Sequence, residues 1–239
     1  MDKMQAFGAP VPGWTPPPRP MGDALLGRYA RLEPLRAAAH AEALFAANSP
    51  DDRIWDYLPY GPFPDLAGYA DWIRSFETSA DPFFYAIRNL ETGNWEGVAS
   101  YLRIAPEAGS IEVGHINFSP ALQRSRAATD AMFLMMQWAF EAGYRRYEWK
   151  CNALNRGSRR AAERLGLSYE GVFRQAGVVK GRNRDTAWFA AIDAEWPALK
   201  SAFETWLSPE NFRPDGVQRH SLTDLTAPIL VTTDPKRGR

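Results

Sequence analysis

The stretch that decides the fold starts as a strand, turns through a basic loop and enters a long helix. It reads Ile111-Glu112-Val113-Gly114-His115-Ile116-Asn117-Phe118-Ser119-Pro120-Ala121-Leu122-Gln123-Arg124-Ser125-Arg126-Ala127-Ala128-Thr129. Backbone N–H groups at a helix N-terminus are unpaired and lie at the positive end of the dipole, so this turn suits a phosphate. The side chains of Arg124 and Arg126 would add charge-assisted contacts. On its own the pattern is weak, because most strand–loop–helix units bind no ligand.

Alternating apolar residues and turn signals on either side of this stretch predict one α/β (α+β) domain. We expect a mixed, mostly antiparallel and twisted sheet of about six or seven strands, with helices on both faces. The predicted strands are 28–32, 83–88, 95–104, 110–118, 145–151, 169–180 and 185–192. The predicted helices are 35–47, 65–79, 126–142, 156–165 and 195–207.

Tails flank the predicted domain, which spans residues 27–207. Residues 1–26 form a proline-rich N-terminal arm that is either disordered or extended along the surface, with Trp14 as an anchoring contact. Residues 208–239 form a polar C-terminal tail with several prolines and a basic end.

Composition and charge exclude several classes of protein. The 239 residues hold one cysteine, Cys151, which fits a reducing compartment, and no apolar run is long enough for a signal peptide or a membrane span. We therefore expect a cytoplasmic protein that binds no membrane. The net charge of zero argues against a general nucleic-acid binder, and no zinc or P-loop signature is present, so no metal is expected.

The charge is unevenly distributed along the chain. Residues 124–184 contain thirteen Lys or Arg against five Asp or Glu, an excess of eight positive charges that the remainder balances. This excess reflects either solvated helix faces or a site for a polyanionic small molecule. The acidic surplus outside this region mildly favours a cationic substrate.

A second stretch makes the pattern specific. It reads Cys151-Asn152-Ala153-Leu154-Asn155-Arg156-Gly157-Ser158-Arg159-Arg160-Ala161-Ala162-Glu163-Arg164-Leu165-Gly166-Leu167-Ser168-Tyr169-Glu170-Gly171-Val172-Phe173-Arg174. From about Arg28 to Leu207 the chain resembles a GNAT acetyltransferase, of the branch that includes the ribosomal-protein N-terminal acetyltransferases. The residues that match the ordered motifs of that family are Glu112, Gly114, Pro120, Asn155, Ser158, Leu165-Gly166, Glu170-Gly171, Arg174, Gly181 and Asp185.

The resemblance implies that acetyl-CoA is the co-substrate and that a primary amine attacks its thioester within a ternary complex. The implied oxyanion donor is a backbone N–H within residues 116–118, where family members carry a β-bulge. Arg124 replaces the first glycine of the family's pyrophosphate loop, a position where glycine lets the backbone approach the ligand closely. The implied coenzyme-binding residues are Ile116, Asn117, Phe118, Gln123, Arg124, Arg126, Ala127, Ala128, Thr129 and Asn155.

The candidate catalytic residues each have a structural alternative. Glu112 is the first candidate for the general base and His115 the second, and Glu112 is equally well explained as a structural carboxylate. Ser158 matches the position proposed to protonate the thiolate, although it could equally cap a helix, as could Asn155.

Three further residues are candidates for binding the acceptor. Trp55 and Tyr57, in an aromatic loop that also holds Tyr60, form either a substrate lid or part of the core. Glu148 lies on a strand of alternating charge, which indicates either an internal ion-pair ladder or a wall facing the substrate.

Two functions stay open after these observations. The first is N-acetyl transfer to a protein N-terminus or to a small-molecule amine such as a polyamine, an amino acid or an aminoglycoside. The second is a non-catalytic GNAT-like module that binds acyl-CoA for regulation, which the missing glycine makes plausible. The oligomeric state is open, with a homodimer as one option.

Overall fold

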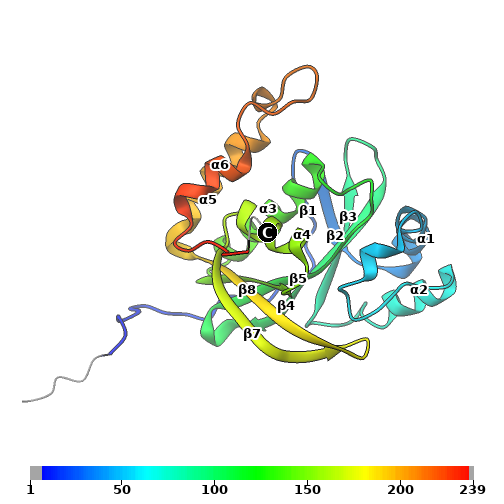
Figure 1. Cartoon of the computed structure of the whole chain (residues 1–239), viewed down its shortest axis with the longest axis horizontal. Coiled ribbons are helices and arrows are strands. Elements are labelled where there is room, and N and C mark those ends of the chain that lie inside the picture. Colours follow the sequence, from blue (N-terminus) through cyan, green and yellow to red (C-terminus); the bar gives the residue numbers. More distant parts are fainter. Residues whose placement is uncertain (1–6, 237–239) are drawn as a thin grey trace, which may run out of the picture.

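An eight-stranded sheet forms the centre of the computed structural model, which describes residues 7–236 (Figure 1). The strand order is β1-β2-β3-β4-β5-β6-β8-β7, and every neighbouring pair is antiparallel except β5–β6. The strands are β1 (Leu25–Leu26), β2 (Ala30–Pro34), β3 (Phe83–Asn89), β4 (Trp95–Ala105), β5 (Ser110–Phe118), β6 (Arg146–Asn152), β7 (Ser168–Val179) and β8 (Arg182–Ile192). The predicted mixed sheet is confirmed with one strand more, because the two-residue β1 is too short to show alternation.

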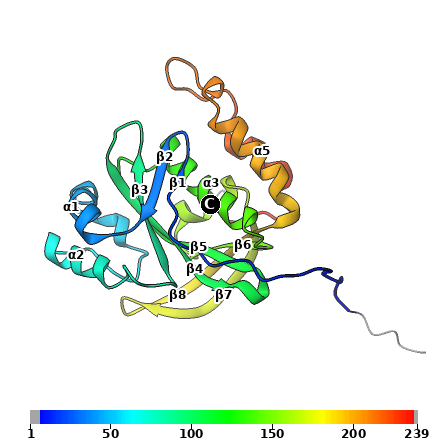
Figure 2. The ribbon, with the colours of Figure 1, turned by 180° about the vertical axis from the view of Figure 1, so that it is seen from behind.

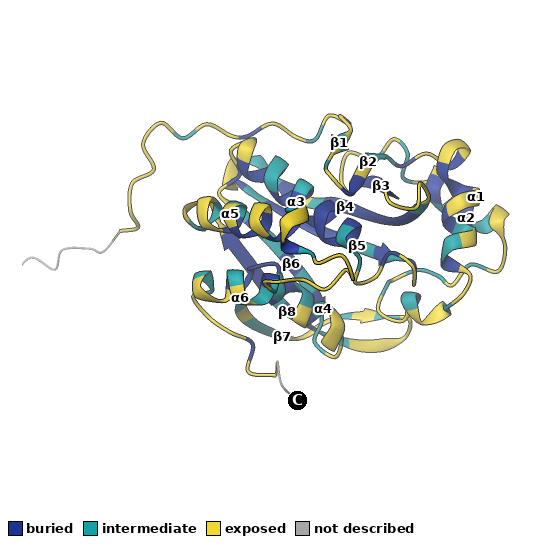
Figure 3. Cartoon of the chain, turned by 90° about the horizontal axis from the view of Figure 1, so that it is seen from above, coloured by how far each residue is buried: buried dark blue, intermediate teal, exposed yellow. Residues whose placement is uncertain are grey.

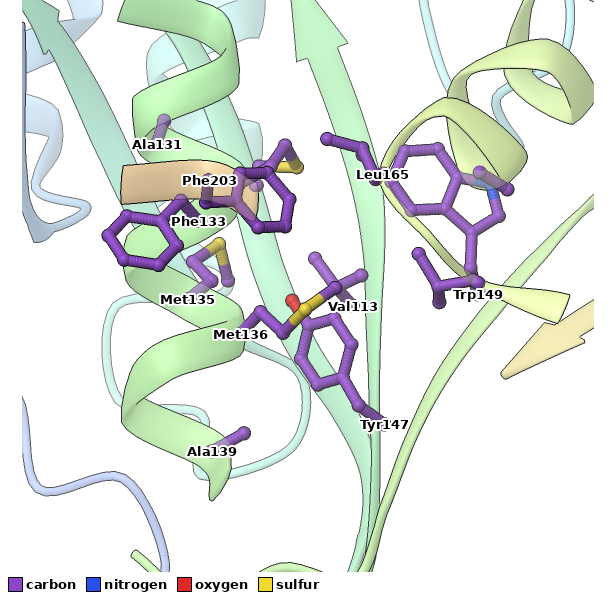
Figure 4. Packing of buried hydrophobic residues seen from close by; sticks show 14 of the residues in the cluster. Val113, Ala131, Phe133, Met135, Met136, Ala139, Tyr147, Trp149, Leu165 and Phe203 are labelled. Carbon is purple, nitrogen blue, oxygen red and sulfur yellow. The ribbon is translucent and has the colours of Figure 1, made fainter. Parts of the chain in front are cut away.

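Helices cover both faces of the sheet, as predicted. They are α1 (Ala37–Asn48), α2 (Leu66–Arg74), α3 (Arg126–Glu141), α4 (Arg156–Arg164), α5 (Trp196–Leu207) and α6 (Leu222–Thr226). The helices α3, α4 and α5 pack on one face, and α1 and α2 pack on the other over β3 and β4. In Figure 4, Met136 of α3 lies against Val113 of β5 and Tyr147 of β6, so the helix that begins at the predicted phosphate loop is part of the main core.

The N-terminal arm runs across the domain toward β1 (Figure 2), and Trp14 contacts the domain. The Trp14 ring lies 5.6 Å from the guanidinium of Arg145, and Tyr144 donates a hydrogen bond of 3.0 Å to the carbonyl of Pro18. The arm therefore has the anchoring contact expected from Trp14. The first six residues of the predicted arm lie outside the described residues.

The C-terminal segment packs against the domain. Figure 3 shows buried residues within this otherwise exposed segment, and Asn211, Leu222, Thr226 and Asp234 are all buried. The carboxylate of Asp234 forms a bidentate ion pair with the guanidinium of Arg159 on α4, and both side chains are almost fully buried. Residues beyond 207 thus contribute to the packing around α4. Among residues 7–236, no helix has the length and apolar character that crossing a membrane requires.

Candidate active site

The strands β5 and β6 separate in the middle of the sheet. Their parallel pairing runs from Ser110 opposite Arg146 to Val113 opposite Trp149 and ends there, although β5 continues to Phe118 and β6 to Asn152. The edge of β5 beyond Val113 therefore faces β6 without a strand partner. Such an edge presents backbone N–H and C=O groups to a ligand that can pair with them as an extended chain would.

A β-bulge lies in the unpaired part of β5. Asn117 is opposite Val98 and Gly114 is opposite Ser100, so two residues of β5, His115 and Ile116, face one residue of β4. His115 has a φ of 50°, which places it in the left-handed region. Because a bulge leaves its extra residue out of the ladder, it frees a backbone N–H near the predicted oxyanion donors.

The side chain of Asn117 is buried beside this bulge. It is 1% exposed, and neither its oxygen nor its nitrogen has a hydrogen-bond partner among the described residues. The flanking residues Ile116 and Phe118 pack against the core that contains α3. The predicted donor segment is thus held in place by packing on both sides of the sheet.

The loop before α3 has a backbone conformation typical of glycine, although Arg124 replaces the family's glycine in this loop. Arg124 has a φ of 62°, the left-handed conformation that glycine adopts most easily, and its side chain is exposed. The Ser125 hydroxyl caps the helix by accepting from the N–H of Ala128 at 3.0 Å, and Gln123 donates to the Phe118 carbonyl at 3.0 Å. The N–H groups of Arg126 and Ala127 lie in the first turn, where no intrahelical acceptor exists.

The side chain of Arg126 faces away from this loop. Its guanidinium forms an ion pair with Glu91 and lies 4.8 Å from the Tyr29 ring and 5.0 Å from the Phe212 ring. The expectation that both arginine side chains contact a phosphate therefore fits the exposed Arg124 and not Arg126. The side chain of Thr129 is also engaged, because Arg164 donates to its hydroxyl at 3.1 Å.

The residues predicted at the start of α4 lie beside the gap between β5 and β6. Asn155 caps α4 by accepting from the N–H of Ser158 at 3.0 Å, which is the structural alternative for Asn155. The indole N–H of Trp149 donates to the Ser158 hydroxyl at 2.9 Å, and this contact does not use the hydroxyl's own proton. Ser158 also interacts with the Cys151 thiol, whose pKa burial raises to about 11.

Glu112 belongs to an ion-pair ladder across the face of the sheet opposite α3. Its carboxylate accepts from Arg103 at 2.8 and 2.7 Å and from Lys150 at 2.9 Å, and it is 3% exposed. Burial raises the pKa of Glu112, and the two cations oppose this rise. Lys150 also pairs with Glu148 at 2.7 Å, and Arg146 joins Glu148 to Glu170. Glu112 and Glu148 thus lie in a ladder, the first of the two interpretations of this strand.

His115 lies at the other end of the same region. Its Nδ1 is 3.1 Å from the hydroxyl of Tyr60, its ring stacks on the Tyr60 ring, and the Phe84 ring lies 5.1 Å away. Burial lowers the pKa of His115 to about 4, and the positive charges of Arg103 and Arg184 add to the shift. The imidazole is therefore neutral at physiological pH, which is the form that can accept a proton.

The aromatic loop touches two other parts of the site. The Tyr57 hydroxyl donates to the carbonyl of Leu154 at 3.3 Å, and Lys180 at the β7–β8 turn donates to the carbonyl of Trp55 at 2.9 Å. The Trp55 ring is buried against Tyr60 and Tyr69, whereas Tyr57 is 40% exposed. Trp55 therefore serves the core, and Tyr57 lies where a lid residue would.

Sequence reasoning missed Arg103, Lys180 and Arg184 as neighbours of His115 and of the aromatic loop. Arg103 has a φ of 47° on β4, and Lys180 belongs to the two-residue Lys180-Gly181 turn, both with positive φ. The Lys-Gly turn was the only available signal, since it predicts a tight hairpin but not what its tip contacts. Among residues 7–236, no cluster of His, Cys, Asp or Glu is arranged to hold a metal ion.

The burial of His115 predicts how stability depends on pH. The pKa of His115 is lowered from the ordinary 6.5 to about 4, so between these values the unfolded chain binds more protons than the folded one. The contribution of the neutral His115 side chain to the free energy of unfolding is complete above pH 6.5 and is lost as the pH falls toward 4. Between pH 7.5 and pH 4.5 the free energy of unfolding of the wild-type protein should therefore fall by about 2–3 kcal/mol more than that of His115→Gln. Urea denaturation of both proteins at the two pH values checks this, and equal losses would contradict it.

Comparison with known proteins identifies the family. A profile of the acetyltransferase (GNAT) domain matches residues 30–168, more than half of the chain. The chain belongs to the GNAT acetyltransferase family. Enzymes of this family bind an acyl-CoA and an acceptor. The comparison with curated proteins found no match.

Solved structures of GNAT proteins support the assignment. A GCN5-related N-acetyltransferase from Brucella melitensis is 46% identical, with 91% of this chain and 100% of that chain covered and a TM-score of 0.89. A probable GNAT-family acetyltransferase from Chromobacterium violaceum is 40% identical, with 82% and 98% covered and a TM-score of 0.77.

The ribosomal-protein branch is not singled out by these comparisons. A ribosomal L7/L12 alpha-N-protein acetyltransferase is 19% identical, with 74% of this chain and 99% of that chain covered and a TM-score of 0.61, and it shares the fold alone. The resemblance to GNAT acetyltransferases is therefore confirmed, whereas the narrower assignment to this branch is not.

Proposed function

We propose that this protein is an N-acetyltransferase that transfers the acetyl group of acetyl-CoA to a primary amine in a ternary complex. The observation that carries the proposal is the gap between β5 and β6, which opens at the bulge of His115 and leads to the N-terminus of α3. The pantetheine arm, which contains amides, would pair with the free edge of β5. The pyrophosphate would lie at the N–H groups of Arg126 and Ala127, beside the side chain of Arg124.

The chemistry requires an oxyanion donor, a base and an acid. A freed N–H within residues 116–118 of the bulged strand stabilises the oxyanion of the thioester carbon. His115 accepts the proton of the attacking amine, because it lies in the bulge where the amine would meet the thioester. Glu112, the first candidate from sequence, has its carboxylate held by Arg103 and Lys150, which suits a structural role better. Ser158, whose proton Trp149 leaves free, protonates the departing thiolate.

The test of this function is an acetyl-CoA turnover screen. Release of free coenzyme A is followed with a thiol reagent against amino acids, polyamines, aminoglycosides and peptides with free N-termini. Acetyl-CoA-dependent turnover of at least one amine, with an N-acetyl product seen by mass spectrometry, supports the proposal. Tight acetyl-CoA binding without turnover of any amine would favour the regulatory acyl-CoA-binding module instead.

The side chain of Arg124 should matter more for coenzyme affinity than that of Arg126. Arg124→Ala should weaken acetyl-CoA binding by about 10- to 100-fold, because it removes a charge-assisted contact to phosphate. Arg126→Ala is the matched control and should change the affinity by less than about threefold, since Arg126 pairs with Glu91. Calorimetric titration of both variants measures the effects. A larger loss for Arg126→Ala would show that this side chain turns toward the ligand.

A further inference from the structure

Arg184 lies on the face of the sheet that carries the ion-pair ladder. On β8, Ala187 and Phe189 point into the core that contains α3, so alternation places Arg184 and Trp188 on the opposite face. The ammonium of Lys150 lies 3.7 Å from the ring centre of Trp188, which confirms the face. The residue of β7 opposite Arg184 is Gly177, which contributes no side chain.

The β7–β8 hairpin carries Arg184, and its tip contacts the aromatic loop, where Lys180 donates to the Trp55 carbonyl and Tyr60 contacts His115. These contacts place Arg184 beside the candidate active site. Its charge contributes to the lowered pKa of His115 on β5 and opposes the raised pKa of Cys151 on β6. Cys151 in turn interacts with Ser158, the candidate acid. A half-buried guanidinium whose charge acts on both His115 and Cys151 lies close to where the acetyl group would be transferred.

The ladder leaves this guanidinium without a counter-ion. Its cations and carboxylates balance within the ladder, three against three: Arg103, Lys150 and Arg146 with Glu112, Glu148 and Glu170. Arg184 follows at the end of the same face and has no carboxylate within ion-pair distance among residues 7–236. The carboxylate of the neighbouring acid, Asp185, accepts hydrogen bonds from the backbone N–H of Gln175 and from the side-chain amide of Asn183.

We infer that the acceptor amine carries an anionic group, a carboxylate or a phosphate, which forms an ion pair with Arg184. The inference rests on the proposed function and narrows its substrate class. A guanidinium presents a planar fork of N–H donors that matches carboxylate and phosphate oxygens. Lys180 at the hairpin turn adds positive charge at the rim, where it donates to the Trp55 carbonyl. The sequence alone favoured a cationic substrate because acidic residues are in surplus outside residues 124–184. The positive charge of Arg184 and Lys180 lies nearer to the acceptor and therefore decides for an anionic group.

Matched amines with and without an anionic group test the inference. Phosphoethanolamine is compared with ethanolamine, and β-alanine with its amide, at equal concentrations of neutral amine. The wild-type kcat/KM should favour an anionic member by about 10- to 100-fold, and Arg184→Gln should remove this preference with acetyl-CoA affinity unchanged. Arg184→Lys should restore part of it. Arg182→Gln, an exposed arginine two residues away, is the matched control and should keep the preference.

Direct binding separates this inference from the proposed function. The same amine pairs are titrated into protein saturated with coenzyme A, where no transfer takes place. Tighter binding of an anionic amine that is lost in Arg184→Gln supports the inference even if no amine is acetylated. The inference is wrong if wild-type protein prefers neutral amines in both assays, or if Arg184→Gln leaves the preference intact. Turnover of neutral amines alone would uphold the proposed function and overturn the inference. A preference for the phosphate pair over the carboxylate pair, or the reverse, identifies the group.

Discussion

His115→Gln should lower the single-turnover rate of acetyl transfer by about 10²- to 10⁴-fold, because it removes the proposed base. Glutamine keeps a polar atom near the Tyr60 hydroxyl, so the bulge and its contact with Tyr60 should survive. The affinity for acetyl-CoA should change by less than about threefold, since the coenzyme would pair with the backbone of β5 and not with the His115 side chain. Rapid-quench kinetics and calorimetric titration on one preparation measure both quantities.

Glu112→Gln provides the comparison that assigns the base. The substitution removes the negative charge that pairs with both Arg103 and Lys150. This variant should therefore have a lower melting temperature, with little change in the single-turnover rate. If Glu112→Gln instead keeps its melting temperature and loses more than about 10²-fold in rate, while His115→Gln stays active, the base is Glu112. Ser158→Ala should lower the single-turnover rate less than His115→Gln does, because water can protonate a thiolate that is already a good leaving group.

Asp234→Ala should lower the free energy of unfolding by about 3–5 kcal/mol, because it leaves the Arg159 guanidinium buried without its counter-ion. For a chain of this size the melting temperature should fall by roughly 10 °C. Desolvation by burial opposes a low pKa for Asp234, but the hydrogen bonds from Arg159 outweigh it and lower that pKa. The pair is therefore ionised at neutral pH. Guanidinium chloride denaturation at neutral pH gives the free energy.

Two further variants keep this prediction specific. Glu204→Ala, an exposed position on α5, should change the stability by less than about 0.5 kcal/mol. Replacing both partners with apolar residues, in Arg159→Met with Asp234→Leu, should recover most of the loss, because no unpaired charge remains buried. A loss below about 1 kcal/mol in Asp234→Ala would show that this ion pair does not hold the C-terminal segment against α4.

Much of the fold could be predicted from the sequence because its signals are local. Alternation along residues 110–118 and the nearly all-apolar α3 define their own elements, and Gly166, predicted to follow the helix, has a φ of 86°. The order of the motifs identified the family because each motif spans only a few neighbouring residues. The C-terminal segment is polar, and its packing depends on partners far away in the sequence, such as Arg159 with Asp234, which are 75 residues apart.

The site was predicted only in part, because side-chain direction depends on distant partners. Arg124 and Arg126 are equivalent in the sequence, yet Glu91 and two aromatic rings hold Arg126 away from the loop. The alternating charges of β6 allowed either a ladder or a substrate wall, and Glu112 on β5 decides between them by pairing with Lys150. Arg184 carries no motif, and its place on the ladder face follows only from the alternation along β8, where Trp188 contacts Lys150.

The most direct test of coenzyme binding at the gap between β5 and β6 is a calorimetric titration of acetyl-CoA into the wild-type protein. The Arg124→Ala variant is titrated under the same conditions. The predicted result is one acetyl-CoA bound per chain, with the affinity reduced by about 10- to 100-fold in Arg124→Ala. The absence of binding heat at several temperatures, with no thermal stabilisation by acetyl-CoA, would show that the coenzyme does not bind and would contradict the proposed acetyl transfer.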